Sequence, residues 1–305
     1  MGVDLGGTKI EVAVARTGPD ASSLDIVARE RTATPRDGGY EAIVERVTSF
    51  VQEVTRGAHA SIDEVAIGIG MPGSTTRAGL VKNANTVCLN GKPFREDLSS
   101  ALGKRIAFDN DANLFALAET RLGAARAYAS GVVFGVILGT GVGGGIVVSG
   151  SVWPGAMGVA GEWGHHAVWA GSPDARDCYC GQRGCVEAHL SGPAVEAQYR
   201  QLAGASLSVA EIVARRGQDV HAERVVEAML ATFGRGLANV IDVLDPTAIV
   251  LGGGLSHLHL LYDEGRERVA RLAFTDDLVT PILKNTCGDS AGVLGAVLLA
   301  ASSVD

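Results

Sequence analysis

Three cysteines lie within eight residues of this chain, in the segment CYCGQRGC at positions 178–185. If their sulfurs are to meet, the backbone must turn back on itself, and Gly181 and Gly184 permit such a tight loop. The cluster can be a disulfide knot, a redox pair or a metal site. The C-x-C-x4-C spacing contains no C-x-x-C redox pair, and five cysteines in the whole chain is an odd number for a disulfide framework.

Composition and charge narrow the class of protein. The 305 residues are 47% apolar and carry a formal net charge of -8, which argues against a basic nucleic-acid-binding surface. The start of the chain does not resemble a signal peptide, and the apolar stretch GVLGAVLLAA is about half as long as a membrane span. We therefore expect a cytoplasmic protein with reduced thiols and with neither nucleic acid nor a membrane as partner.

A metal site is the interpretation that best fits the cysteine cluster. Cys178, Cys180 and Cys185 supply three thiolates, and zinc prefers four tetrahedral nitrogen or sulfur ligands. The segment EWGHH supplies two candidates for the fourth ligand, His165 and His166. Three cysteines and one histidine would close the coordination sphere, so this zinc would be structural. The alternative is three buried thiols without a metal.

The apolar pattern alternates between strands and helices, which predicts an α/β fold. Two segments, 1–16 and 131–150, each predict two strands joined by a glycine-rich turn, so the chain contains a weak internal repeat. Further strands are predicted within 64–73, 105–111 and 247–256, and helices within 37–57, 111–123, about 221–244 and from about 291.

The glycine-rich turns suggest phosphate binding. GTGVGG at 139–144 fits the dinucleotide pattern, but a strand follows it where that fold needs a helix. Two glycine turns can instead bring backbone N–H groups close to phosphate oxygens, and Thr8 and Thr140 can add hydroxyl donors. Asp4 could hold a hydrated Mg²⁺. The third glycine cluster, 252–254, offers a flat surface for an adenine, although each cluster alone can be a simple tight turn.

The segment DNDAN at 109–113 carries the candidate general base. Asp109 or Asn110 can cap the helix that follows, which leaves Asp111 free to point into a cleft. A sugar hydroxyl that attacks a γ-phosphate needs a carboxylate to orient it and to accept its proton. Glu162 and Glu187 flank the cysteine cluster, and such carboxylates suit the hydroxyl groups of a neutral polyol.

These motifs together resemble the ROK family of sugar kinases. DLGGTK, NDAN, LGTGVGGG, EWGH, CYCGQRGCVE and LGGGLS occur in the order typical of that family, over essentially the whole chain. The resemblance implies the two-lobed actin-like ATPase (ribonuclease H-like) fold with a cleft between the lobes. It implies an N-terminal lobe at 1–120, joined by a helix at about 290–305, and a C-terminal lobe at 121–289 that carries the zinc site. It also implies a homo-oligomer, with a homodimer expected.

The resemblance further implies roles for individual residues. Asp111 would be the catalytic base in phosphoryl transfer from MgATP to a hexose. The sugar would contact Gly73, Asn110, Asp111, Glu162, His165 and Glu187. The nucleotide and its metal would contact Asp4, Gly6, Gly7, Thr8, Lys9, Gly139, Thr140, Gly141, Gly253 and Gly254. The zinc ligands would be His165, the histidine of EWGH, and Cys178, Cys180 and Cys185.

Within the family, the segments TPRD, MPGS and LVKNANTVCLNGKPFREDL resemble the bacterial fructokinase (mannofructokinase) branch, which would make fructose 6-phosphate from fructose. N-acetylglucosamine kinase and glucokinase are the alternatives. A sugar-responsive ROK repressor would carry a DNA-binding domain before the first glycine loop, and a dead sugar sensor would lack the base. Only three residues precede Asp4, fewer than is usual in such kinases, so we expect a frayed or truncated first strand.

Overall fold

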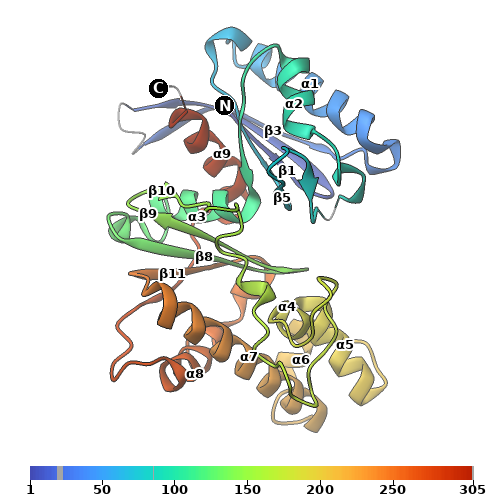
Figure 1. The fold of residues 1–305 in the computed structure, drawn as a ribbon, viewed down its shortest axis with the longest axis vertical. Coiled ribbons are helices and arrows are strands. Elements are labelled where there is room, and N and C mark those ends of the chain that lie inside the picture. The colour runs from blue at the N-terminus through green and yellow to red at the C-terminus, as the bar shows by residue number, and fades with distance from the viewer. Residues whose placement is uncertain (19–22, 85, 304–305) are drawn as a thin grey trace.

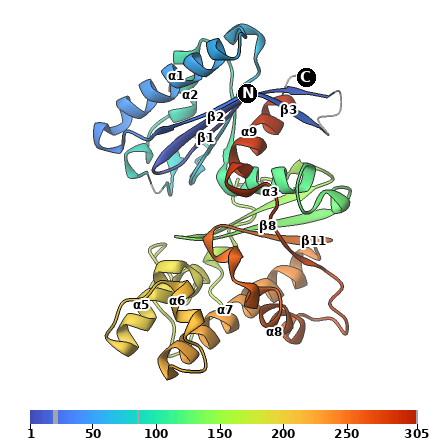
Figure 2. The ribbon, with the colours of Figure 1, turned by 180° about the vertical axis from the view of Figure 1, so that it is seen from behind.

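The computed structural model describes residues 1–18, 23–84 and 86–303, and its chain forms two lobes (Figures 1 and 2). Each lobe is built on a five-stranded sheet. The first sheet has the order β3-β2-β1-β4-β7, with the strands Leu24–Ala33, Lys9–Thr17, Gly2–Leu5, Gly68–Met71 and Ala107–Asn110. The second has the order β10-β9-β8-β11-β12, with the strands Ser151–Val152, Val142–Val148, Val132–Leu138, Ala248–Gly252 and Ile282–Lys284.

The two sheets repeat one plan, as the paired glycine turns predicted. In the first, β1 pairs antiparallel with β2 and parallel with β4. In the second, β8 pairs in the same two ways with β9 and β11. In both sheets a glycine-rich turn therefore joins the central strand to its antiparallel neighbour. A small two-stranded sheet, β5 (Ser74–Thr75) with β6 (Val81–Lys82), is added to the first lobe.

The expectation of a frayed first strand is wrong. All four residues of β1 are paired with β2, and three of them also with β4. Met1 is buried, and its ammonium group donates a hydrogen bond to the carbonyl of Ala66 at 2.7 Å. The strand is secured because it lies at the centre of its sheet, with a neighbour on each side.

The longer helices follow the apolar periodicity of the sequence. Helix α1 (Gly39–Gly57) buries Tyr40, Ile43, Val47, Phe50, Val51 and Val54 on one face, against the first sheet. Helix α2 (Phe94–Leu102) lies beside α1. The second lobe contains α4 (Glu187–Leu190), α5 (Gly192–Ala203), α6 (Val209–Ala214), α7 (Val220–Leu244) and α8 (Glu264–Leu272).

Two helices lie between the sheets, and each packs on the sheet of the other lobe and not on the sheet whose strand precedes it. Helix α3 (Asp111–Arg121) follows β7 of the first sheet but packs on β8 and β9 of the second. Helix α9 (Ala291–Ala301) follows β12 of the second sheet but packs on β1, β2 and β4 of the first (Figure 1). The division of the chain at residues 120 and about 290 stays a prediction, and residues 304–305 lie outside the described part.

Glycines allow these helices to approach the strands and each other closely. A side chain at Gly68 of β4 would collide with the carbonyl of Ala296 in α9. A side chain at Gly295 of α9 would collide with the carbonyl of Leu114 in α3. The backbone of α9 is therefore in direct contact with the backbones of β4 and α3. Among the described residues, no helix combines the length and apolar character that crossing a membrane requires.

Candidate active site

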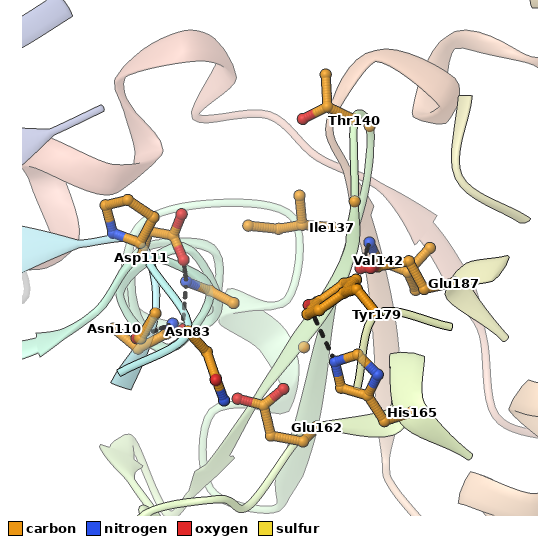
Figure 3. A pocket seen from close by; sticks show the side chains of 17 residues that line it. Asn83, Asn110, Asp111, Ile137, Thr140, Val142, Glu162, His165, Tyr179 and Glu187 are labelled. Atoms are coloured by element: carbon orange, nitrogen blue, oxygen red, sulfur yellow. Dashed lines mark hydrogen bonds between the residues drawn. The ribbon is translucent and has the colours of Figure 1, made fainter. Parts of the chain in front are cut away.

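A cleft of about 610 Å³ opens at the level where the two lobes meet. Figure 3 shows Asn110 and Asp111 on one side and His165, Tyr179 and Glu187 on the other. The cleft is lined by Pro72, Gly73, Asn83, Asn110, Asp111, Ala112, Ile137, Gly139, Thr140, Gly141, Val142, Gly143, Gly144, Glu162, His165, Tyr179 and Glu187. All six predicted sugar contacts are in this set, although the residues come from distant parts of the sequence.

Asp111 is the first residue of α3 and faces the cleft. Asn110 caps the helix, since its side-chain oxygen accepts hydrogen bonds from the backbone N–H groups of Ala112 and Asn113. The Asp111 carboxylate accepts a hydrogen bond from the N–H of Ala112 at 2.8 Å. Burial, and next the negative charge of Asp4, raise the pKa of Asp111 to about 7. This value suits a group that accepts a proton near neutral pH.

Asn110 also holds a neighbouring loop on its own side of the cleft. Its side-chain amide donates a 2.7 Å hydrogen bond to the carbonyl of Gly73, in the loop after β4. Gly73 has a φ of 88°, and a side chain there would collide with the backbone of Lys82 and Ala84. The Gly73 loop, β6 and the start of α3 are thereby held together as one wall.

The facing wall comes from the second lobe. Glu187 opens α4, and its carboxylate accepts a 2.7 Å hydrogen bond from the N–H of Val142, at the end of the second glycine turn. Glu162 is exposed and points into the cleft from the segment before His165 (Figure 3). These carboxylates and the imidazole of His165 can accept or donate hydrogen bonds to a polyol.

The three glycine clusters lie at different distances from the cleft. Gly139, Thr140 and Gly141 of the second turn line it. Gly254 lies next to this turn, because a side chain at Gly139 would reach the Gly254 backbone. Gly253 and the first-turn residues Gly6, Gly7, Thr8 and Lys9 are not among the lining residues.

Asp4, just before the first glycine turn, acts electrostatically on Asp111, because its charge raises the pKa of that carboxyl group. Its carboxylate lies against Gly292 at the start of α9, where a side chain would collide with it. Burial, and next the charge of Glu11, raise the pKa of Asp4 to about 6. Two carboxylates with raised pKa values, Asp4 and Asp111, fit a divalent cation, because such an ion would stabilise their charged forms.

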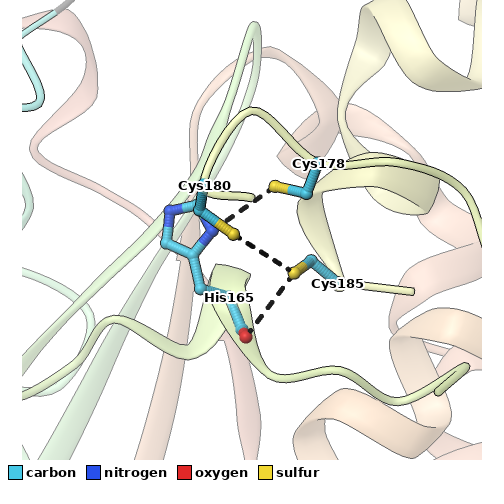
Figure 4. A group of neighbouring side chains, drawn as sticks. All are labelled: His165, Cys178, Cys180 and Cys185. Carbon is cyan, nitrogen blue, oxygen red and sulfur yellow. Dashed lines mark hydrogen bonds between the residues drawn. The ribbon is translucent and has the colours of Figure 1, made fainter. Parts of the chain in front are cut away.

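The predicted zinc ligands meet at one point beside the cleft (Figure 4). The ligand atoms of His165, Cys178, Cys180 and Cys185 all lie within 4.8 Å of one another. The Cys180 and Cys185 sulfurs are 3.6 Å apart, and Nδ1 of His165 is 3.7 Å from the Cys178 sulfur. Ligands of a tetrahedral zinc are separated by roughly 3.5–3.8 Å, so this set fits the ion. His166 is not part of it.

A model of the ROK family matches residues 1–303. The chain belongs to the ROK family. An N-acetyl-D-glucosamine kinase of Photobacterium profundum is 37% identical over 307 residues, which cover 98% of each chain. The N-acetyl-D-glucosamine kinase of Vibrio cholerae is 37% identical over 311 residues, with the same coverage.

Solved ROK structures have the same fold. The ROK hexokinase from Thermus thermophilus is 31% identical, with a TM-score of 0.85 over 99% of this chain and 98% of that one. A ROK glucokinase from Streptomyces griseus, in complex with glucose and AMPPNP, is 29% identical, with a TM-score of 0.77 over 99% of each chain. These similarities confirm the two-lobed α/β fold. They do not favour the fructokinase branch, because the Photobacterium and Vibrio relatives are both N-acetyl-D-glucosamine kinases.

Sequence reasoning missed two polar residues of this ROK cleft. Tyr179 lies between two predicted zinc ligands, and its hydroxyl is 3.2 Å from Nε2 of His165. Its position inside residues 178–185, which we call the cysteine loop, was the available signal. Asn83 lines the cleft from the loop after β6, with a φ of 58°. It belongs to the segment compared with fructokinases, of which Asn85 lies outside the described residues.

Proposed function

We propose that the protein is an ATP-dependent sugar kinase and that its preferred substrate is N-acetyl-D-glucosamine. The observation that carries the kinase activity is one cleft that contains both the Asp111 carboxylate and the glycine turn 139–141. The choice of sugar rests on relatives that share 37% identity over 98% of both chains. This substrate replaces the fructose that the loop at 80–98 suggested.

In the proposed reaction, a hydroxyl of the sugar attacks the γ-phosphorus of ATP. The new bond joins the sugar oxygen to phosphorus, and the bond to the oxygen of ADP breaks. Asp111 orients the hydroxyl and accepts its proton, for which its raised pKa is suited. Backbone N–H groups of the turn at 139–141 hold the phosphates. When bound, Mg²⁺ neutralises phosphate charge, and Asp4 is the side chain that would hold it.

The remaining lining residues would hold the sugar. Glu162, Glu187 and His165 face the side chains of Asn110 and Asp111 across the cleft (Figure 3). A sugar hydroxyl can donate to either carboxylate and can accept a hydrogen bond from the Asn110 amide. Zinc at the cysteine loop would fix His165 without taking part in the chemistry. A homodimer stays a prediction.

A coupled assay of ADP release tests this proposal. It compares kcat/KM for N-acetylglucosamine, glucose, fructose, mannose and N-acetylmannosamine at saturating MgATP, with the Asp111→Asn variant as a control for background hydrolysis. We expect the highest value for N-acetylglucosamine. A higher value for fructose would return the protein to the fructokinase branch, and no turnover of any sugar would remove the kinase assignment.

A further inference from the structure

A second cavity adjoins the segment that leads into the cysteine loop. Its volume is about 370 Å³, within the range of small-molecule pockets. It is lined by the segment at 173–176, by His189 of α4, and by residues of α5 and α7. None of its lining residues lines the catalytic cleft.

Two guanidinium groups line this cavity, and neither forms an ion pair with a carboxylate of the described residues. Arg176 is half-buried, and its Nη1 donates to the carbonyl oxygens of Ala188 and Ala194. Among the described residues, no group accepts a hydrogen bond from its Nε or Nη2, and no carboxylate lies within 4.0 Å of it. The exposed Arg224 of α7 likewise has no ion pair within the described chain.

The other polar side chains of the cavity do not cancel this positive charge. Asp174 is the single carboxylate among the lining residues, and it is too far from Arg176 for an ion pair. Gln198 and Gln201 of α5 also line the cavity, and their amides can donate hydrogen bonds. The lining therefore offers several donors and a net positive charge, which together suit an anion.

One wall of the cavity is rigid and aromatic. Trp169 stacks on His189 with ring centroids 5.7 Å apart, and its Nε1 donates to the hydroxyl of Thr232 at 2.9 Å. The guanidinium of Arg235 lies 3.9 Å from the Trp169 ring. Such a wall fixes the shape of the cavity and offers an apolar surface for the carbon skeleton of a ligand.

We propose that this cavity is a second ligand site, which binds a small phosphate ester through Arg176, Arg224 and the amides of Gln198 and Gln201. The free N–H groups of Arg176 match the paired oxygens of a phosphate. The volume accommodates a phosphorylated sugar as well as inorganic phosphate.

Occupancy of this site should affect the catalytic cleft, because two elements are shared. The carbonyl of Arg176 accepts a 2.7 Å hydrogen bond from Gly184, inside the cysteine loop. The N–H of Arg176 donates to Nε2 of His189 at 3.3 Å, and His189 lies on α4, which begins with the cleft residue Glu187. A ligand that moves Arg176 would thus act on both the cysteine loop and α4. This coupling rests on the proposed function, whereas the binding site does not.

Calorimetric titration of the ligand-free protein tests the site directly. The probes are inorganic phosphate and glucose 6-phosphate. Gln201→Glu adds a negative charge at the rim, and Arg224→Gln removes a positive one. Neither residue makes a side-chain contact that folding requires among those described. Arg200→Gln, on α5 but outside the cavity lining, is the matched control.

We expect both probes to bind, and each cavity variant to weaken that binding roughly tenfold or more, as loss of a charge-assisted contact does. The control should bind as the wild type does. Because the cleft can also bind phosphate, binding is assigned to this cavity only where the cavity variants weaken it and the Arg200→Gln control does not. Wild-type protein that binds neither probe, or variants that bind both with unchanged affinity, would overturn the proposal. If inorganic phosphate binds but glucose 6-phosphate does not, the site binds the free ion only, and the proposal of a phosphate ester as the ligand is wrong.

Discussion

Nδ1 of His165 lies 3.7 Å from the sulfur of Cys178, while the opposite edge of the same ring faces the cleft. One imidazole therefore contacts the cysteine loop and also lines the candidate sugar site. The Nε2 atom, on the cleft side, is 3.2 Å from the Tyr179 hydroxyl. A metal that holds Nδ1 would fix the ring and leave Nε2 as an N–H donor.

We predict that Cys178→Ala loses one zinc ion per chain and raises the KM for the sugar more than the KM for ATP. The reason is that the metal fixes His165, whereas the glycine turn at 139–141 lies outside the cysteine loop. Metal content by mass spectrometry, melting temperature and both KM values give the test. Cys88→Ala, a half-buried cysteine outside the cluster, is the control. A zinc-free Cys178→Ala protein with wild-type KM values would show that the loop needs no metal.

We predict that Asp111→Asn lowers kcat roughly 10²–10⁴-fold, the range for loss of a positioned general base. The KM for the sugar should change much less, since the amide keeps the shape and one acceptor of the carboxyl group. Steady-state kinetics measure both constants.

The neighbouring Asp109 provides a control for Asp111. Its carboxylate accepts hydrogen bonds from the Asn113 side chain and the Asn110 N–H, both at 2.7 Å, and it does not line the cleft. Asp109→Asn should thus lower stability but leave most of kcat. If the two variants lose kcat equally, the effect of Asp111 is structural and not that of a base.

The raised pKa of Asp111 predicts an unusual pH dependence of stability in the ligand-free protein. Between its ordinary value of 3.8 and about 7, the folded state binds a proton that the unfolded state has released. The free energy of unfolding therefore falls as the pH rises through this window. Asp111→Asn lacks this loss, so it should melt higher than wild type at pH 8, with a smaller difference at pH 5. Melting curves at both pH values measure the difference, and an equal shift at both would contradict the raised pKa.

Glu119 is fully buried on α3 and holds the segment that leads into α9. Its carboxylate accepts backbone hydrogen bonds from Thr286 at 3.1 Å, Cys287 at 2.8 Å and Ala124 at 2.9 Å. We predict that Glu119→Gln costs about 1–3 kcal/mol of the free energy of unfolding, because the amide turns a donor toward N–H groups. Urea unfolding measures this, with the exposed Glu53→Gln as a control that should change little. A loss no larger than that of Glu53→Gln would refute the role of Glu119.

The sequence predicted those helices and strands in which apolar residues recur at regular positions. The two strand pairs around the glycine turns, α1, α3, α7 and the start of α9 lie where expected, because their apolar positions are regular and glycine or proline marks their ends. The edge strand β3 was missed, since its residues LDIVARERTA are mostly exposed and show no apolar alternation. The short helices α5 and α6 were missed as well, with only a few buried residues each.

Those residues of the candidate site that belong to short sequence motifs could be predicted. Asp111 and the four predicted zinc ligands belong to such motifs, and the structure brings the four ligands together and places Asp111 in the cleft. Asn83 reaches the cleft only through tertiary contacts, so no local pattern marked it, whereas the position of Tyr179 between two of the cysteines was a local signal. The cavity beside Trp169 joins residues from four separate segments and has no sequence signature at all.

The exchange of α3 and α9 between the sheets has a consequence for biosynthesis. Strands β1, β2 and β4 are made first, yet the helix that covers them, α9, comes from residues 291–301. The apolar face of the first sheet that α9 covers therefore stays exposed while the ribosome adds more than two hundred further residues. The lobe that emerges first is finished last, and during translation it is this sheet that chaperones would need to shield.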